Sequence, residues 1–293
     1  MSISGKLTRR KFLYTAAGAI SGAAVAGGWG FEESNHPQVT RLEISLARLP
    51  HAFDGFTIAQ LSDFHYDDRF SAVPIQKAVE IVNGLHPDLI ALTGDFVTVP
   101  LLSRSPGTRK SFAQGADPCA GILQGLQAPM GKFAVLGNHD ANSDPARVVR
   151  ALRDHHLPVL INRSVPLERG KDRIWLAGID DVLEGRPDVG LALENIPSSE
   201  CTILLAHEPD FADEASVTPV DLQLSGHSHG GQVWIPGIGA PWLPPLAKRY
   251  PRGLYKVGTL TLYTNIGIGT IRAPIRLNCP PEITLITLRA KSL

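Results

Sequence analysis

Five apolar runs of strand length in this chain end in clusters of polar residues, and this arrangement constrains the fold more than any other sequence feature. In chain order the polar clusters are residues 62–65, 93–95, 137–140, His207 and residues 225–232. Helical periodicity separates several of the runs, which indicates an α/β domain. Ligands in such domains bind at the carboxyl ends of the strands, so the five clusters predict one shared site.

The remaining elements follow from hydrophobic periodicity. Strands are predicted over the apolar runs 42–46, 56–61, 89–92, 133–136, 174–179, 202–206, 222–224, 260–263 and 283–288. Residues 74–85 show the apolar spacing of one helical face. A second helix is predicted over 146–156, with Asp144 as its cap and Pro145 as its first residue. Residues 98–118 have the composition of a long surface loop, and the C-terminal third predicts an antiparallel or mixed sheet.

The five clusters contain Asp, His and Asn but no Cys, which favours Mn, Fe, Zn or Mg as ligand partners over a thiolate site. Residues two apart in extended chain point to the same side, so Asp63 with His65, and His227 with His229, can each offer two ligands. Gly230 and Gly231 would let a phosphate oxygen approach the main chain. Each cluster alone is common in turns, but all five in this order predict a metal site. The other five histidines are interpreted as exposed or helix-capping residues.

The N-terminus differs in character from the rest of the chain. Basic residues, including Arg9 and Arg10, precede an apolar stretch over 12–30, and the sequence TRRKFL resembles the twin-arginine export signal. We therefore predict a signal or N-terminal membrane segment over 1–30, a linker over 31–40 and one domain over 41–293. The twin-arginine translocase would carry the folded chain to the periplasm or the outer face of the cytoplasmic membrane. A membrane anchor is the alternative interpretation of the same segment.

Whole-chain charge gives no reason to expect a nucleic-acid partner. Lys plus Arg and Asp plus Glu each number 28. A nucleic-acid-binding domain of this size would normally carry a clear basic excess. The polar clusters are therefore the features that predict function.

The motif order D-x-H, G-D, G-N-H-D, an isolated H and G-H-x-H resembles the signature of the calcineurin-like metallophosphoesterases, over residues 56 to 232. The C-terminal sequence GIGTIRAPIRLNCPPEITLITL is similar to that of exported or membrane-associated bacterial phosphodiesterases. The resemblance implies a four-layer α/β/β/α sandwich of two mixed β-sheets. It also implies a dinuclear centre of divalent metal ions.

Carried over motif by motif, the resemblance implies seven metal ligands. Asp63, His65 and His229 would hold one ion, Asn138, His207 and His227 the other, and Asp95 would bridge both. A water between the ions would attack phosphorus. His139 is implied to be a non-ligand histidine that stabilises the transition state or protonates the leaving oxygen, while Asp140 would orient it and hold its protonated form.

Several residues differ from those of related families, and these differences reduce the range of activities to expect. Asp95 lacks the D-R-G continuation of protein Ser/Thr phosphatases, and Asp140 stands where those enzymes have Glu. Thr98 occupies a position where bacterial relatives often carry Asp. The resemblance therefore implies a phosphodiesterase that hydrolyses phosphodiester or pyrophosphate bonds of a lipid-linked or envelope substrate.

Three further readings of the activity remain open. One is an activity like that of UDP-2,3-diacylglucosamine hydrolase of lipid A biosynthesis, although export would separate the enzyme from that cytoplasmic precursor. The second is a phosphomonoesterase. The third is a non-catalytic metal-binding scaffold, which the full set of ligand residues disfavours.

Overall fold

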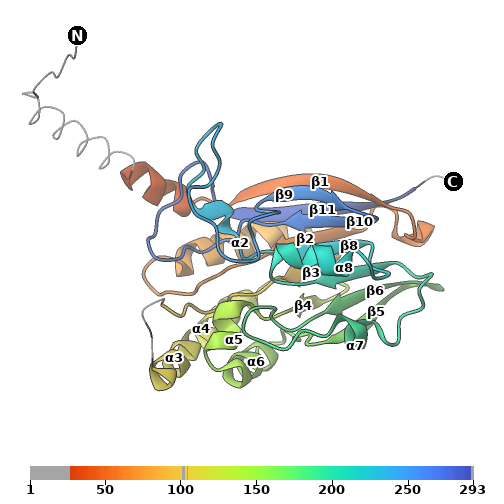
Figure 1. Ribbon diagram of the computed structural model, residues 1–293, viewed down its shortest axis with the longest axis horizontal. Coiled ribbons are helices and arrows are strands. Elements are labelled where there is room, and N and C mark those ends of the chain that lie inside the picture. Colours follow the sequence, from red (N-terminus) through yellow and green to blue (C-terminus); the bar gives the residue numbers. More distant parts are fainter. Residues whose placement is uncertain (1–26, 101–102, 104, 292–293) are drawn as a thin grey trace, which may run out of the picture.

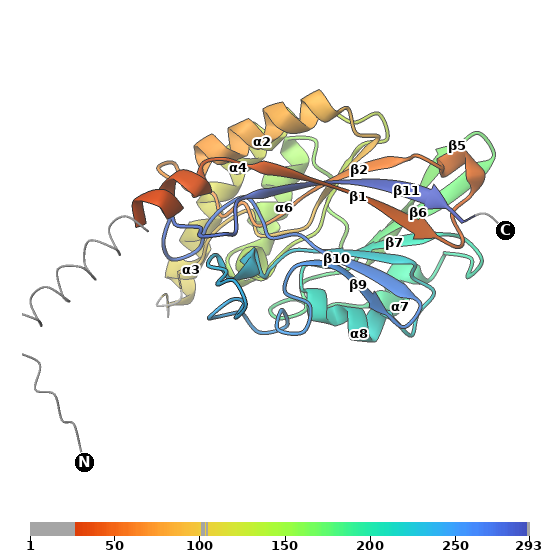
Figure 2. The same cartoon turned by 90° about the horizontal axis from the view of Figure 1, so that it is seen from above.

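Two β-sheets face each other at the centre of the molecule, and helices cover the outer face of each (Figures 1 and 2). The computed structural model describes residues 27–100, 103 and 105–291. The first sheet has the order β1 (Gln38–Leu46), β11 (Glu282–Ala290), β2 (Thr57–Leu61), β3 (Leu89–Leu92) and β4 (Lys132–Ala134). The second has the order β5 (Arg163–Arg169), β6 (Asp172–Gly178), β7 (Thr202–Leu205), β8 (Leu222–Ser225), β10 (Leu260–Thr264) and β9 (Gly253–Val257).

Both sheets are mixed. Strands β2, β3 and β4 are parallel, as are β6, β7, β8 and β10. Strand β11 runs antiparallel to β2, while β5 and β9 run antiparallel to their neighbours β6 and β10. The predicted four-layer α/β/β/α sandwich of two mixed sheets is confirmed.

Alternate residues of the central strands face different hydrophobic cores. On β3, Leu89 and Ala91 face the core between the two sheets, whereas Ile90 and Leu92 face the helices. On β7, Ile203 faces the space between the sheets and Leu204 faces the opposite helical layer. A strand that is covered on both faces needs apolar residues at every position, which is why these strands read as continuous apolar runs.

The helices that cover the sheets include both predicted ones. The first sheet is covered by α2 (Ala72–Leu85), α4 (Ala116–Leu123) and α6 (Pro145–Asp154), and the second by α7 (Val189–Leu193) and α8 (Ala212–Ala215). Short helices α3 (Pro106–Phe112) and α5 (Asn138–Asn142) lie on connections. Helix α6 begins as predicted, because the Asp144 side chain accepts a hydrogen bond from the backbone N–H of Arg147.

Residues 98–118 differ from the loop that we predicted. The described part of this segment contains α3 and the start of α4. Helix α4 buries Ala116, Cys119, Ala120 and Leu123, a spacing that fits one helical face. The predicted loop ended at residue 118, inside α4, so the apolar spacing of the helix was divided between two segments and the helix was not predicted.

Strands β5 and β9 were also missed, and both lie at edges of the second sheet. In β9 exposed and partly buried residues alternate, and in β5 only Leu167 is buried. An edge strand needs little apolar surface and tolerates proline, as at Pro166, so it leaves no apolar run in the sequence.

The predicted linker at residues 31–40 is instead structured. Residues 27–34 are helical, and β1 begins at Gln38. The carbonyl of Gly30 accepts a hydrogen bond from the N–H of Arg276, and the Glu33 carboxylate accepts one from the N–H of Cys279. The predicted signal, including Arg9 and Arg10, lies outside the described residues. Within the described ranges no helix is long and apolar enough to cross a membrane.

Candidate metal centre

All seven predicted ligand residues meet at the carboxyl ends of the central strands. Asp63 and His65 follow β2, Asp95 follows β3, and Asn138 begins helix α5 after β4. His207 follows β7, and both His227 and His229 follow β8. The polar clusters therefore meet in one site, as the ends of the apolar runs predicted, and the structure places this site where strands of both sheets end.

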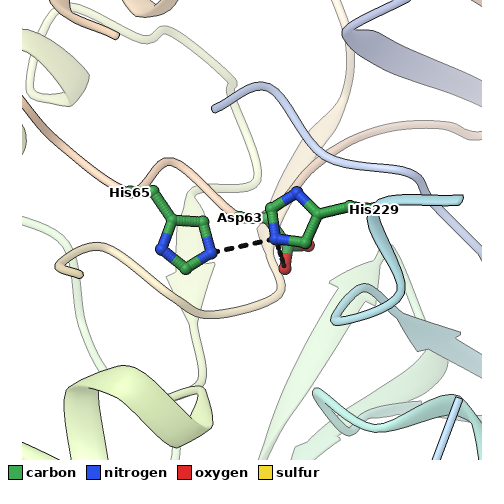
Figure 3. A group of neighbouring side chains, drawn as sticks. All are labelled: Asp63, His65 and His229. Atoms are coloured by element: carbon green, nitrogen blue, oxygen red, sulfur yellow. Dashed lines mark hydrogen bonds and ion pairs between the residues drawn. The ribbon is translucent and has the colours of Figure 1, made fainter. Parts of the chain in front are cut away.

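Asp63, His65 and His229 form the first group of ligand atoms (Figure 3). The Nε2 atoms of the two histidines lie 2.9 Å apart, and His229 Nε2 lies 3.3 Å from Asp63 Oδ1. The backbone N–H of His227 donates to the Asp63 carboxylate and holds it in place. Three ligand atoms thus converge on one point.

Asp95, His207 and His227 form the second group, and Asp95 connects it to the first. Asp95 Oδ2 lies 3.4 Å from His65 Nε2 and 3.3 Å from His207 Nε2, whereas Asp95 Oδ1 accepts a hydrogen bond from the N–H of His139. One carboxylate oxygen therefore faces a histidine of each group, which is the arrangement that a bridging ligand requires.

The backbone is left-handed at five of the seven ligand positions. These are Asp63, His65, Asp95, His227 and His229, with φ between 43° and 68°. Such conformations are unfavourable for residues other than glycine and are found mainly where function requires them. Neighbouring Gly94 is also left-handed, and a Cβ atom there would lie 2.7 Å from both the backbone N of Gly137 and His207 Nδ1. The tight turn after β3 therefore needs glycine.

Two buried polar atoms at the site lack a hydrogen-bond partner among the described residues. They are Asn138 Oδ1 and His207 Nε2. His207 Nδ1 donates to the carbonyl of Thr93 at 2.5 Å, so Nε2 is the ring nitrogen that faces the site. Leaving such atoms unpaired costs free energy, about 1–3 kcal/mol each, unless another group binds them. A metal ion would satisfy both, so the residues fit a metal site.

Electrostatics keep most of the candidate ligands in the protonation state that metal binding needs. Burial lowers the pKa of His65 and His229, and it lowers that of His227 to about 4, so these rings are neutral. Burial opposes ionisation of Asp95, but nearby His207 holds its pKa well below the usual value. His207 is the exception. Burial lowers its pKa, but Asp95 and Asp63 outweigh this and raise it, so metal must displace a proton there.

His139 forms a third group of neighbouring candidate ligand atoms, with His65 and Asp95, but its ring is held differently. Its Nδ1 accepts a hydrogen bond from the backbone N–H of Val99 at 2.8 Å. The neutral ring therefore carries its proton on Nε2. The same bond occupies the nitrogen that a second proton would need, so the prediction of a positively charged His139 is corrected to a neutral ring that donates from Nε2.

Asp140 does not orient the ring of His139, contrary to the prediction. Its carboxylate oxygens accept backbone N–H groups of Asp95, Phe96, Val97 and Gly137. Burial and the neighbouring Asp95 raise the pKa of Asp140 to about 8, while the N–H donors oppose that rise. Asp140 thus ties the turn after β3 to the start of α5, and it acts on the site through the backbone.

Comparison with known proteins agrees with this geometry. The family model of the calcineurin-like phosphoesterases matches residues 56–231. The chain is 36% identical to the uncharacterized metallophosphoesterase YkuE of Bacillus subtilis, over 97% of this chain and 99% of that protein. It is 31% identical to the phosphodiesterase YaeI of Escherichia coli, over 96% and 99%.

The chain is a calcineurin-like phosphoesterase. It is also 32% identical to a zebrafish (Danio rerio) transmembrane protein with a metallophosphoesterase domain, over 86% of this chain and 57% of that protein. As a member of this family, the chain is a metal-dependent phosphoester hydrolase. Proteins of the family typically bind two divalent metal ions.

Gly230 and Gly231 do not offer free amides to substrate in this phosphoesterase. The N–H of Gly230 donates to the Ser228 hydroxyl, and that of Gly231 donates to the Ser228 carbonyl. Both residues have positive φ, and a Cβ at Gly230 would lie 2.7 Å from the Cys279 sulfur. The glycines allow the tight turn that carries His229, and their predicted role in substrate binding stays a prediction.

Two residues that hold the ligands of the phosphoesterase were not predicted. Thr98 Oγ1 lies 3.1 Å from His65 Nδ1, so it takes the place of the Asp expected there. Arg276 is fully buried, and it donates to the carbonyls of Ile266, Gly269 and Cys279 beside His229. No spacing signal marks Arg276, because it comes from a loop distant in sequence from every ligand.

Two clefts open onto the metal centre of the phosphoesterase. The first, of about 490 Å³, is lined by Asp95, Asn138, His139, His227 and His229, with an apolar wall. That wall includes Val99, Leu183, Trp242, Pro244, Pro245 and Ile271. The second cleft, of about 630 Å³, is lined by His65 and Thr98 and by polar residues such as Asp67, Asp68, Ser111 and Gln114. Pro100 and Arg272 line both and lie between them.

Proposed function

We propose that this phosphoesterase is a phosphodiesterase whose dinuclear centre is formed by the seven ligand residues above. The observation that carries this proposal is that two clefts meet at one metal centre. A phosphodiester has two substituents on its phosphorus, and each cleft can take one. A monoester has a single substituent and would leave one cleft empty.

The two clefts differ in the side chains that line them. This difference suggests a substrate whose two substituents on phosphorus, called its arms below, differ in polarity. The first cleft has Trp242, Pro244, Pro245 and Ile271 among its apolar residues, whereas the second mixes carboxylates and hydroxyls, such as Asp67, Asp68 and Ser111, with apolar residues such as Phe70 and Phe112. An apolar arm beside His139 and a polar arm beside His65 fit this contrast best. A lipid-linked phosphodiester or pyrophosphate of the cell envelope has this pattern.

The chain's own residues divide the work of hydrolysis. Two divalent ions would supply positive charge and an activated water at the phosphorus. Asp95 connects the two groups of ligands through Oδ2, which faces His65 and His207. Asp63 and the histidines would fix the position of the metal centre. His139 points Nε2–H at the ester and stabilises, by hydrogen bonding, the negative charge that develops on the departing oxygen. Asp140 keeps the turns that carry Asp95 and His139 in place.

We further propose that the enzyme is exported by the twin-arginine route and works in the periplasm or on the outer face of the cytoplasmic membrane. Arg9 and Arg10 in TRRKFL support this location. The relative from zebrafish is named a transmembrane protein, which is consistent with action near a membrane. A periplasmic location makes an envelope phosphodiester a better substrate than UDP-2,3-diacylglucosamine, the cytoplasmic precursor.

The direct test compares bis(4-nitrophenyl) phosphate with 4-nitrophenyl phosphate, using the purified full chain loaded with Mn²⁺. We expect higher kcat/KM for the diester. Ser111→Trp, which narrows the second cleft, should lower diester hydrolysis more than monoester hydrolysis. An equal or faster reaction with the monoester would show a phosphomonoesterase instead, and full metal loading with no turnover of either ester would show a scaffold.

A further inference from the structure

Residues 233–247 form a loop without a single charged side chain. Their sequence is VWIPGIGAPWLPPLA, and we call this segment the apolar loop. Ile238 at its tip is 78% exposed, and Ile235 and Trp242 are also exposed. The tip is a tight turn in which the N–H groups of Ile238 and Gly239 donate to the carbonyl of Ile235. A large apolar side chain fixed on a turn tip, with no charge nearby in sequence, indicates contact with an apolar partner.

Two arginines stack on the tryptophans at either end of the loop tip. The Arg252 guanidinium lies 4.6 Å from the centre of the Trp234 ring, and that of Arg272 lies 4.1 Å from the centre of Trp242. Tryptophan favours the headgroup region of a bilayer, and arginine can bind lipid phosphates there. The loop thus has an apolar tip, followed by aromatic and cationic side chains. A bilayer has the matching layers, with apolar acyl chains beneath charged headgroups.

The apolar loop lies at the same end of the molecule as the start of the described chain (Figures 1 and 2). The N–H of Trp234 donates to the carbonyl of Leu277, and Arg276 in turn binds Gly30 in the helix over 27–34. In that helix Trp29 is 69% exposed, and Phe31 packs edge-on against Phe70 at 6.5 Å. The preceding residues 12–26 are apolar and follow a basic stretch. The end of β11 lies at the opposite end of the molecule.

We propose that the apolar loop inserts into the surface of a phospholipid bilayer, so that the first cleft opens toward the membrane. Trp242 belongs both to the loop and to the lining of that cleft, which joins the lipid contact to the metal centre. The apolar arm of the substrate then passes from the bilayer along the cleft wall to the centre. The substrate class is a membrane phospholipid or other lipid phosphodiester. The assignment of that class rests on the proposed phosphodiesterase activity, whereas the insertion itself does not.

Insertion is measured with an environment-sensitive dye on the full chain. The three native cysteines, Cys119, Cys201 and Cys279, are buried, so Ile238→Cys adds an exposed thiol that can be labelled selectively. The matched control is Val217→Cys, because Val217 is an apolar residue that is 87% exposed on the turn after α8. Vesicles of phosphatidylcholine and phosphatidylglycerol should shift the emission of the dye at 238 to the blue and leave that at 217 unchanged.

The same vesicles provide the functional test. Ile238→Asp should lower kcat/KM about tenfold for a diacylglycerol 4-nitrophenyl phosphate in the vesicles, a change of about 1.4 kcal/mol. Hydrolysis of soluble bis(4-nitrophenyl) phosphate should be unchanged, and Val217→Asp should leave both reactions unchanged. This pattern would confirm that the loop presents the cleft to lipid.

Three outcomes would overturn the proposal. The first is an equal dye response at 238 and 217. The second is a blue shift at 238 that depends on protein concentration without vesicles, which would identify a second copy of the chain as the partner. The third is an equal loss of soluble and vesicle activity in Ile238→Asp. Failure of the phosphodiesterase proposal is distinguishable, because it would abolish turnover of both diesters and leave the dye response intact.

Discussion

The backbone N–H of Val99 donates a hydrogen bond to Nδ1 of His139 at 2.8 Å. This bond fixes the neutral tautomer, with the proton on Nε2 at the edge of the first cleft. The histidine is therefore positioned to donate a hydrogen bond, and its protonated Nε2 has no lone pair to offer a metal ion. The function of His139 follows from this contact, which involves a main-chain group and has no signature in the sequence motif.

His139→Gln should lower kcat by about 10²–10³-fold, the usual effect of altering a hydrogen-bond donor that faces developing negative charge. The loss should be largest for an ester with a poor alkoxide leaving group, whose oxygen develops the most negative charge, and small for 4-nitrophenolate, whose charge spreads over the ring. Metal content should be unchanged, because His139 is not a ligand. Measurement of kcat for a leaving-group series tests this, and an equal loss along the whole series would refute the hydrogen-bonding role of His139 at the leaving oxygen.

Thr98→Val should weaken metal binding by about 10–100-fold, the usual effect of removing a group that orients a ligand. The hydroxyl of Thr98 fixes Nδ1 of His65, and valine keeps the shape but removes that contact. Thr98→Ser retains the hydroxyl and is the matched control. Titration of the metal-free proteins with Mn²⁺ measures the effect, and identical affinities for the two variants would contradict it.

Asp140→Asn should destabilise the fold and the site together. An amide NH₂ cannot accept the backbone N–H groups that the carboxylate now accepts, and each orphaned donor costs about 1–3 kcal/mol. Thermal unfolding of the metal-free chain should show a lower Tm than the wild type. A variant with wild-type Tm and reduced activity would instead indicate that Asp140 acts directly on His139.

Replacement of Arg9 and Arg10 by lysine should keep the protein in the cytoplasm, because the predicted signal depends on the arginine pair. Cell fractionation followed by immunodetection measures this. Replacing Lys6 by arginine is the matched control, as it keeps the charge outside the motif. Unchanged export of the double-lysine variant would remove the twin-arginine proposal and leave the metal centre unaffected.

The apolar runs predicted the α/β domain and the meeting of the polar clusters because both depend on the same feature, whereas the four-layer sandwich followed from the family resemblance. Strands covered on both faces, such as β3 and β7, must be continuously apolar, so they are visible as runs. Parallel neighbours end at the same edge, so the polar residues that follow them, such as Asp95 and His207, must come together.

The parts that sequence reasoning missed depend on contacts between distant segments. Edge strands β5 and β9 need no apolar run. The role of Asp140 depends on four main-chain donors, and that of Gly230 on the closeness of Cys279. Arg276 donates to the backbone carbonyls of Ile266 and Gly269. The residues next to Arg276 in the sequence give no sign that its side chain is buried there.

The measurement that tests the dinuclear centre most directly is metal content together with diester hydrolysis, for the full chain and for Asp95→Asn. Asp117→Asn serves as the control, because Asp117 lies on α4 with an exposed side chain. We predict about two divalent ions per chain in the wild type and control, and loss of at least one ion with nearly all activity in Asp95→Asn. Retention of both metal and activity in Asp95→Asn would contradict the bridging role of Asp95 and with it the dinuclear centre.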